Sequence, residues 1–177
     1  MKKALVVVDM QKDFLDDAVL GNERCRSVVP GIVEKLKKGE CDMVFATRDT
    51  HQKNYLQTQE GKNLPVEHCI EGSDGWQITE EIQQALENCT TIVEYINKPA
   101  FGSPELAGRL AREGIEEVEF TGVCTGICVI SNAMLAKANA PEMLVSVDAS
   151  CCACVTEESH KTALEAMKLC QITIKNE

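Results

Sequence analysis

The chain has 177 residues, of which 44% are hydrophobic and 26% charged, the composition of a globular protein. Its formal net charge of -10 disfavours nucleic acid as a partner, because binding to a phosphate backbone needs clustered Lys and Arg side chains. Its apolar runs fall far short of the roughly 20 residues that cross a bilayer, and its first residues lack the pattern of a secretion signal. We therefore expect one domain over residues 1–177, a cytoplasmic location, and neither a nucleic-acid nor a membrane partner.

Ten cysteines raise the question of a disulfide framework or a structural zinc site. Half of them are scattered singly, several within apolar runs, where Cys packs as a small hydrophobic residue. The two local groups, at 124–128 and 151–154, lack the paired C-x-x-C spacing of zinc knuckles. We expect most of the cysteines to be reduced and buried.

The first part of the chain predicts a strand, a helix and a second strand. Residues 3–8 form a continuous apolar run, which is typical of a strand buried on both faces of a parallel sheet. Apolar residues at helical spacing over 28–38 predict a helix that ends at Gly39, and 42–47 is the second predicted strand. The polar stretch 48–74 follows, and loops of that length in compact domains usually carry function.

The rest of the chain continues the alternation of strands and helices. Further strands are predicted at 90–96, 118–123, 143–147 and 171–174, and helices at 78–86, 103–114, 128–138 and 156–169. Ser103, followed by Pro104, and Thr156 are the expected helix caps. This order predicts an α/β fold with three layers, in which helices flank a doubly wound, Rossmann-like, six-stranded parallel sheet.

Ligands bind to such sheets beyond the carboxyl ends of the strands, at the point where the strand order reverses. Polar residues that end the predicted strands should therefore converge there. They are Asp9, Asp49, Lys98 and Cys128, with Asp148 as a further candidate.

Cys128 is the candidate nucleophile. It lies at the first turn of a predicted helix that follows a strand, where unpaired N–H groups and the helix dipole favour a thiolate. Such a thiol needs a proton acceptor and a stabilising positive charge, which Asp9 and Lys98 can supply. Burial should raise the pKa of Asp9, while the Lys98 ammonium should oppose that rise. From the residues alone, an Asp that organises a loop and a solvated Lys are the alternatives.

Asp49, His51 and His68 form a candidate metal site. Asp49 and His51 are two residues apart in extended chain, so their side chains point to the same side and can share a cation, and His68 lies farther along the same loop. One carboxylate and two imidazoles suit Zn, Fe or Mn and leave positions open for water or substrate. The alternative, which spacing alone favours, is that both histidines are ordinary loop residues. We expect His160, within a predicted helix, to be a surface or packing residue.

Cys124 has three possible roles: a second reactive thiol, a redox partner of Cys128, or a backbone donor beside the nucleophile. The step from Cys124 to Cys128 differs from C-x-x-C, which disfavours a thioredoxin-like pair. In an acyl-transfer reaction the N–H groups of Cys124 and Cys128 could bind the developing oxyanion.

Five segments of the chain match the motifs of one family in the same order. They are residues 8–14, 48–51, 65–72, 97–103 and 122–129. Together they resemble the isochorismatase-like cysteine hydrolase superfamily, and most of all its nicotinamidase branch. The resemblance covers nearly the whole chain.

The resemblance implies a catalytic triad of Cys128, Asp9 and Lys98, which attacks an amide through a thioester. It further implies an oxyanion hole formed by the Cys124 and Cys128 amides, after a cis peptide bond between Val123 and Cys124.

The resemblance also implies a divalent metal held by Asp49, His51 and His68, which separates the nicotinamidase branch from metal-free relatives. A small-molecule amide substrate and a homo-oligomeric assembly are expected on the same basis.

The expected substrate pocket departs from the family pattern. Nicotinamidases usually place a Trp before the Pro of the third motif, where it stacks on the pyridine ring, whereas Leu64 stands at that position here. Phe14 matches an expected pocket aromatic, and Gly126 replaces a commonly acidic position. The resemblance therefore implies a pocket that includes Phe14, Leu64 and Val123, with one aromatic face missing.

The expected function is a metal-assisted cysteine amidase that hydrolyses nicotinamide or a close analogue to the acid and ammonia. The alternatives are a metal-free isochorismatase-like or carbamoyl-amide hydrolase, a non-catalytic small-molecule-binding relative, and a thiol redox protein in which Cys124 and Cys128 form a reversible disulfide.

Overall fold

Strands from the whole length of the chain form one parallel sheet in the computed structural model, which describes residues 1–15 and 17–177. The strands of this described part are β1 (Lys3–Val8), β2 (Met43–Asp49), β3 (Ile92–Lys98), β4 (Glu117–Val123), β5 (Leu144–Ala153) and β6 (Thr173–Lys175). Their order is β3-β2-β1-β4-β5-β6, and every neighbouring pair is parallel. The predicted doubly wound sheet is confirmed.

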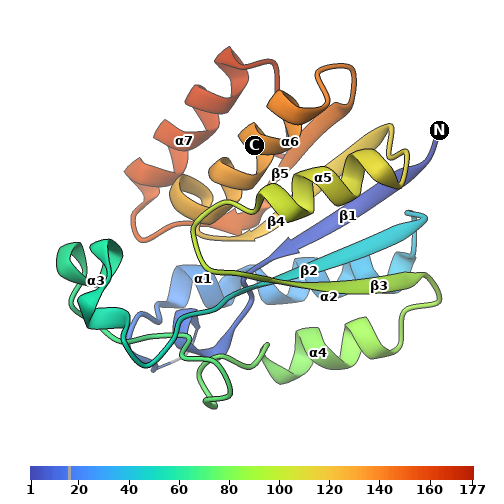
Figure 1. The fold of residues 1–177 in the computed structure, drawn as a ribbon. Helices are drawn as coiled ribbons and strands as arrows, with labels where there is room; N and C mark the ends of the chain where they lie inside the picture. Colours follow the sequence, from blue (N-terminus) through green and yellow to red (C-terminus); the bar gives the residue numbers. More distant parts are fainter. Residues whose placement is uncertain (16) are drawn as a thin grey trace.

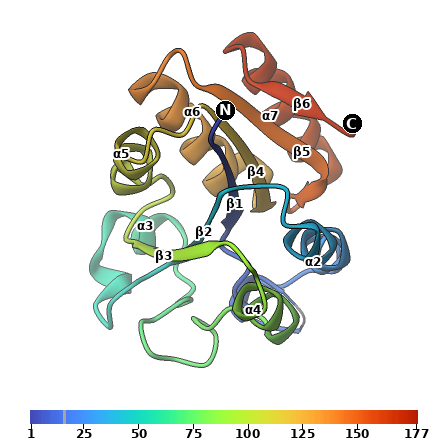
Figure 2. The same cartoon turned by 90° about the vertical axis from the view of Figure 1, so that its right-hand side faces the viewer.

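Helices cover both faces of this sheet, which gives three layers (Figures 1 and 2). One face carries α1 (Glu23–Ser27), α2 (Val29–Lys38) and α4 (Glu80–Glu87), and the other carries α5 (Pro104–Arg112), α6 (Ile130–Asn139) and α7 (Glu157–Leu169). The short helix α3 (Gln59–Asn63) belongs to the long segment after β2 and lies beyond the carboxyl ends of the strands in Figure 1. The long polar stretch is therefore folded over the edge where the site was expected.

Local signals account for the ends of these helices. Ser103 caps α5, because its hydroxyl accepts a hydrogen bond from the N–H of Leu106, and Pro104 follows at the first helical position. Thr156 caps α7 through the N–H of Ser159. Both caps were predicted from the sequence, and both are confirmed.

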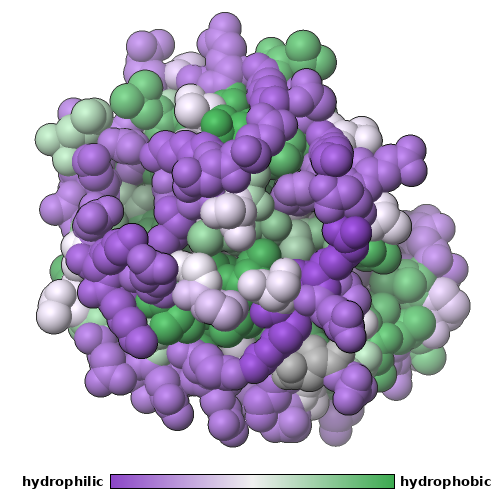
Figure 3. Space-filling view, turned by 180° about the vertical axis from the view of Figure 1, so that it is seen from behind, coloured by the Kyte–Doolittle hydropathy of each residue, from purple (hydrophilic) through white to green (hydrophobic). Residues whose placement is uncertain are grey.

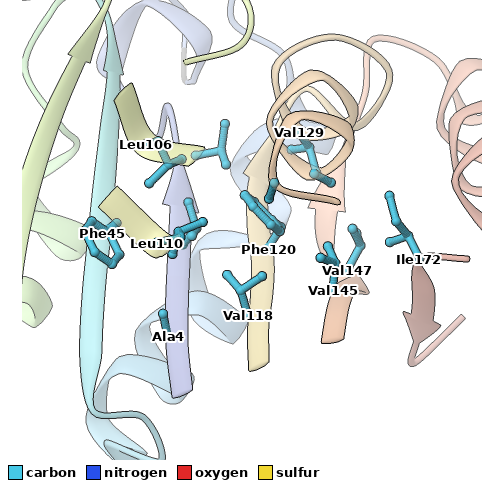
Figure 4. Packing of buried hydrophobic residues seen from close by; sticks show 14 of the residues in the cluster. Ala4, Phe45, Leu106, Leu110, Val118, Phe120, Val129, Val145, Val147 and Ile172 are labelled. Atoms are coloured by element: carbon cyan, nitrogen blue, oxygen red, sulfur yellow. The ribbon is translucent and has the colours of Figure 1, made fainter. Parts of the chain in front are cut away.

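The core lies in two clusters, one on each side of the sheet. Figure 4 shows the cluster beneath α5, α6 and α7, where Phe45 and Phe120 pack against Leu110. Val44, the neighbour of Phe45, belongs to the opposite cluster with Ile32 of α2. Because successive strand residues point to opposite faces, a sheet covered on both sides needs apolar residues at every position. This explains the continuous apolar runs in the sequence.

Strand β5 is longer than predicted and changes the position of one expected site residue. The sequence predicted a strand at 143–147, but β5 continues to Ala153, because Cys152 and Ala153 still pair with β4. Asp148 therefore lies within the strand, where its carboxylate is 2.6 Å from the Lys35 ammonium and accepts a hydrogen bond from Asn176. The expectation that Asp148 joins the site is wrong.

None of the helices in the described residues is long and apolar enough to span a bilayer. Seen from behind, the face in Figure 3 is mostly hydrophilic, with hydrophobic groups in small, separate areas.

Candidate active site

Four of the expected residues meet where β1, β2, β3 and the turn after β4 come together. Lys98 ends β3 directly beside Asp49, its register partner at the end of β2. The Lys98 ammonium nitrogen lies 2.6 Å from Oδ2 of Asp9 and 3.3 Å from Oδ1 of Asp49. The same nitrogen lies 3.4 Å from Sγ of Cys128. All four side chains are buried, so the charges interact with little screening by water.

The charge states of Lys98 and Asp9 follow from this burial. Burial alone would lower the pKa of Lys98, but Asp9, Cys128 and Asp49 outweigh it and raise that pKa, so the ammonium stays charged. Burial raises the pKa of Asp9, and the Lys98 ammonium opposes the rise, as the sequence predicted. The Thr47 hydroxyl donates to Oδ1 of Asp9 at 2.6 Å and fixes the orientation of that carboxylate.

The environment of Cys128 differs from the sequence-based expectation. The turn was expected to favour the thiolate, yet burial and the Asp9 carboxylate raise the pKa of the Cys128 thiol, and Lys98 only partly opposes them. A helix terminus cannot outweigh the loss of water around a side chain that is 5% exposed. A thiol with a raised pKa keeps its proton at neutral pH, and the Asp9 carboxylate, which shares the Lys98 ammonium with Cys128, is placed to take that proton.

The backbone after β4 makes a tight turn around the thiol. The peptide bond between Val123 and Cys124 is cis, as the family resemblance implied. A π-helical turn, Thr125–Val129, then leads into α6, and the Cys124 carbonyl accepts hydrogen bonds from the N–H groups of Ile127 and Val129. These bonds hold the backbone of Cys124 close to that of Cys128.

Gly122, just before this turn, is required by close strand packing. Its φ is 109°, and an added Cβ would lie 2.2 Å from the carbonyl oxygen of Val8. The absence of a side chain lets β4 approach β1 and brings the turn to the edge where Asp9 lies.

Asn132, which the sequence analysis did not single out, connects the turn to the segment after β3. Its side-chain nitrogen donates to the carbonyls of Cys128, at 2.8 Å, and Phe101, at 3.1 Å. Its oxygen accepts from the N–H of Ser103 at 2.9 Å. The side chain is buried, so three backbone groups depend on it. The sequence offered one signal for Asn132, namely a polar residue one helical turn after the nucleophile.

Gln11 is a second buried amide that the sequence analysis missed. Its side chain accepts from the N–H of Asp49 at 2.6 Å and donates to the carbonyl of the same residue at 2.8 Å. It also donates to the carbonyl of Trp76. Gln11 therefore holds the backbone from which the Asp49 carboxylate projects.

His160 also contacts the turn. It was expected to be a surface or packing residue of its helix, but Nδ1 lies 2.8 Å from Oγ1 of Thr125, a fully buried residue of the π-helical turn. Helix α7 is thus hydrogen-bonded to the segment that carries the thiol.

The three expected metal ligands lie together, with one further carboxylate that the sequence analysis missed. Nε2 of His51 is 2.9 Å from Oδ2 of Asp49, and Nε2 of His68 is 3.5 Å from the same oxygen. Oε1 of Glu60, from α3, lies 3.5 Å and 3.7 Å from these two imidazole nitrogens. One ligand atom from each of the four residues lies within 4.8 Å of the others.

This donor set fits a divalent cation. Nδ1 of His68 is 2.8 Å from the Val66 carbonyl, so it carries the proton and leaves Nε2 free to bind a metal. Burial alone would raise the pKa of Asp49, but hydrogen bonds to both histidines and the Lys98 charge keep it below its usual value. Two imidazoles and two carboxylates suit Zn, Fe or Mn.

The three residues expected to contact substrate have different surroundings. The Phe14 ring lies 5.6 Å from the His68 ring. Leu64 is 39% exposed, and its carbonyl accepts from the hydroxyl of Tyr55, a buried residue whose ring contacts both histidines. Val123 is fully buried in the core cluster on the α2 side.

Cys124 and Cys128 have different partners. The pKa of the Cys124 thiol is raised chiefly by the thiols of Cys154 and Cys25, whereas the Cys128 thiol contacts the Lys98 ammonium and its pKa responds to Asp9. A Cys124–Cys128 redox pair would need the two thiols to face each other, whereas each of them faces other residues.

Comparison with known proteins yields one consistent group. A family model described as the isochorismatase domain matches residues 3–176. Nicotinamidase 3 of Arabidopsis thaliana is 28% identical over 163 residues, which cover 91% of this chain and 78% of that protein. The structure of the pyrazinamidase/nicotinamidase from Streptococcus mutans UA159 has a TM-score of 0.86 and 27% identity, and covers 98% of this chain and 99% of its own. The pyrazinamidase of Pyrococcus horikoshii in complex with zinc has a TM-score of 0.77 and 26% identity, and covers 98% of both chains.

Proposed function

Because the chain belongs to the isochorismatase family, we propose that it is an amide hydrolase acting on C–N bonds, with Cys128 as its nucleophile. The observation that carries this proposal is the buried contact of the Lys98 ammonium with the Asp9 carboxylate and the Cys128 thiol. This arrangement joins a nucleophile, a proton acceptor and a positive charge in one place.

The reaction begins with transfer of the Cys128 proton to Asp9 while the sulfur attacks the amide carbonyl carbon. Lys98 stabilises the anionic sulfur during this transfer. The N–H groups of Cys124 and Cys128 bind the oxyanion that develops on the substrate. Asp9 then returns the proton to the leaving nitrogen, which departs as ammonia, and water hydrolyses the thioester to release the acid.

Asp49, His51, Glu60 and His68 would hold a divalent cation beside this centre. When bound, the cation supplies a Lewis acid that polarises and orients polar groups of the substrate. Asp49 links the two parts of the site, because its Oδ1 contacts Lys98 while its Oδ2 faces the histidines.

The proposed substrate is nicotinamide or a close analogue. Phe14 supplies an aromatic face beside His68, whereas Leu64 replaces the second aromatic residue expected in the family. An aromatic pair contributes about 0.5–1.5 kcal/mol beyond burial, so its loss weakens ring binding by roughly two- to twelvefold. We therefore expect a higher KM for planar aromatic amides than a pocket with two aromatic faces would give.

Ammonia release from nicotinamide and pyrazinamide tests the proposal. Wild type should release ammonia, and Cys128→Ala should reduce the rate to background while the circular dichroism spectrum stays unchanged. Cys170→Ser is the matched control, because Cys170 is an exposed cysteine outside the site. Turnover that survives in Cys128→Ala would refute the assignment of the nucleophile. Binding of both amides without turnover by wild type would favour a non-catalytic relative.

Metal analysis separates this proposal from a metal-free hydrolase. Elemental analysis by mass spectrometry should find close to one divalent metal ion per chain, and His51→Ala should lower this occupancy. Glu60→Gln removes the negative charge of Glu60 but keeps the shape of its side chain. During dialysis against a chelator, this variant should lose less metal than His51→Ala. A wild-type enzyme that is active without bound metal would favour the metal-free class.

A further inference from the structure

We propose that Cys124 and Cys154 form a reversible disulfide bond when the protein meets a peroxide. Cys124 directly precedes the π-helical turn that carries Cys128, and Cys154 directly follows β5. Neither residue is needed as a thiol in the proposed amide hydrolysis. The two cysteines therefore form a modification site beside the active centre.

The backbone brings the two cysteines together at the ends of two neighbouring strands. Val123 of β4 and Ala153 of β5 are register partners in neighbouring parallel strands, and Cys124 and Cys154 are the next residue of each chain segment. Neighbouring strands lie about 4.8 Å apart, within the Cα separation of about 4.4–6.8 Å found in disulfides. The largest influence on the pKa of each thiol is the other thiol, so the two side chains lie side by side.

Cys154 is the more reactive of the two. Polar groups around its sulfur, led by the Cys124 thiol and followed by the Ser159 hydroxyl, outweigh burial and lower its pKa to about 5. The Cys154 thiol in turn raises the pKa of Cys124. A lowered pKa at Cys154 beside a raised pKa at Cys124 favours the arrangement in which a peroxide oxidises one sulfur and the other resolves it.

Small molecules can reach Cys154 from one side. Cys154 lines an open hollow between the π-helical turn and α7, together with Gly126, Ile127, Ser159 and Ala163. Although Cys154 is only 3% exposed, it forms part of the wall of this hollow. A peroxide is small enough to enter it.

A third cysteine, Cys25 of α1, raises the alternative of a metal site. The Cys25 and Cys154 thiols both raise the pKa of the Cys124 thiol. In the described residues, the set that contains His51 and His68 is the one group of ligand atoms arranged to hold a metal ion, and the three cysteines form no such group. Cys25 belongs to the core cluster and does not line the hollow, so Cys154 is the better partner for Cys124.

The oxidation proceeds in two balanced steps. The Cys154 thiolate attacks one oxygen of hydrogen peroxide, the O–O bond breaks, and hydroxide leaves, which yields a sulfenic acid. The Cys124 sulfur then attacks the sulfenic sulfur, the S–O bond breaks, and the departing hydroxide takes the Cys124 proton to leave as water. The two sulfurs together lose two electrons, which the peroxide accepts, and a dithiol reductant reverses the reaction.

The bond would affect the active centre, and this consequence rests on the proposed function. The two sulfurs must approach to about 2.05 Å, which draws Cys124 toward β5. The Cys124 N–H then leaves the position where it binds the oxyanion. Loss of one such donor lowers kcat about 100-fold to 1,000-fold, so the oxidised form should be nearly inactive.

Peptide mapping by mass spectrometry tests the disulfide without reference to activity. Wild type treated with hydrogen peroxide should yield one peptide pair joined through Cys124 and Cys154, and dithiothreitol should release it. Cys154→Ser should abolish the pair, whereas Cys25→Ser and Cys128→Ala should both retain it. A link from Cys124 to Cys25, or only sulfinic acid at Cys154, would overturn the proposal.

Activity measurements test the consequence. Peroxide should inactivate wild type, and dithiothreitol should restore the rate. Cys154→Ser should keep its basal activity. In this variant peroxide should cause no inactivation that dithiothreitol can reverse. Equal and equally reversible inactivation of Cys154→Ser would refute a role for this bond. If the wild type had no amidase activity, the proposed function would fail while the peptide map would still decide the disulfide.

Discussion

Replacement of Lys98 by Met should destabilise the protein far more than the loss of an ordinary surface ion pair. The Lys98 side chain is fully buried, and its ammonium contacts the carboxylates of Asp9 and Asp49. Met has a similar length and no charge, so Lys98→Met leaves two buried carboxylates without their shared cation. The steric change is small, and the electrostatic change dominates.

The magnitude follows from the burial of both partners. Removal of one partner from a buried ion pair costs about 3–5 kcal/mol, because the remaining charge is neither solvated nor paired. In a protein of this size each kcal/mol lowers the melting temperature by about 2–4 °C, so Lys98→Met should lose about 6–20 °C. The double variant Asp9→Asn with Lys98→Met removes both charges of the Lys98–Asp9 pair. Its free energy of unfolding should therefore fall by less than the sum of the decreases in the two single variants.

Urea denaturation followed by circular dichroism measures these differences, with a chelator present so that metal binding does not contribute. Lys12→Met is the matched control, because Lys12 lies 2.7 Å from Asp74 in a pair exposed to solvent. Such a pair contributes about 0–1 kcal/mol. If Lys98→Met cost no more than Lys12→Met, the view of Lys98 as a buried and paired ammonium would be refuted.

Three further changes test the supporting structure. Gly122→Ala should cost about 1–3 kcal/mol or more in urea denaturation, because its Cβ would meet the Val8 carbonyl at 2.2 Å and its φ is 109°; an unchanged midpoint would contradict this contact. Asn132→Ala should lower kcat while KM changes little, because the nucleophile's carbonyl loses its donor; a loss of stability alone would argue against a positioning role. Burial would raise the pKa of Asp148, but hydrogen bonds led by Lys35 hold it below its usual value of about 3.9. A carboxyl with a lowered pKa stabilises the fold above the unfolded pKa and loses this effect as pH falls, so the stability advantage over Asp148→Asn should be full at pH 7 and shrink below about pH 4. An advantage that stayed constant down to pH 2 would exclude this ion pair as its source.

The sequence identified those site residues that combine a reactive side chain with a position at the end of a predicted strand. Asp9, Lys98 and Cys128 each lie at or just beyond a strand end, and the parallel order of the strands brings such ends to one edge. Glu60 could not be identified in this way, because it reaches the two histidines from a short helix within a polar segment. Nothing in the local pattern of that segment distinguishes a ligand from a solvated carboxylate.

The charge state of Cys128 was the principal error of the sequence analysis. Position at a helix start is a local property, and it argued for a thiolate. The raised pKa comes from burial and from the Asp9 carboxylate, which directly follows β1 and is far from Cys128 in the sequence. Through-space electrostatics outweighed the local effect.

By itself, the sequence determined the alternation of strands and helices, the caps at Ser103 and Thr156, and the family to which the chain belongs. These features depend on neighbouring residues, whose periodicity and hydrogen-bonding groups act over a few positions. Only the tertiary structure decided the full length of β5, the contact between Cys124 and Cys154, and the burial of the charged site. Each of these arises between segments far apart in the chain, because exclusion of water and contact across strands exist only after the sheet has assembled.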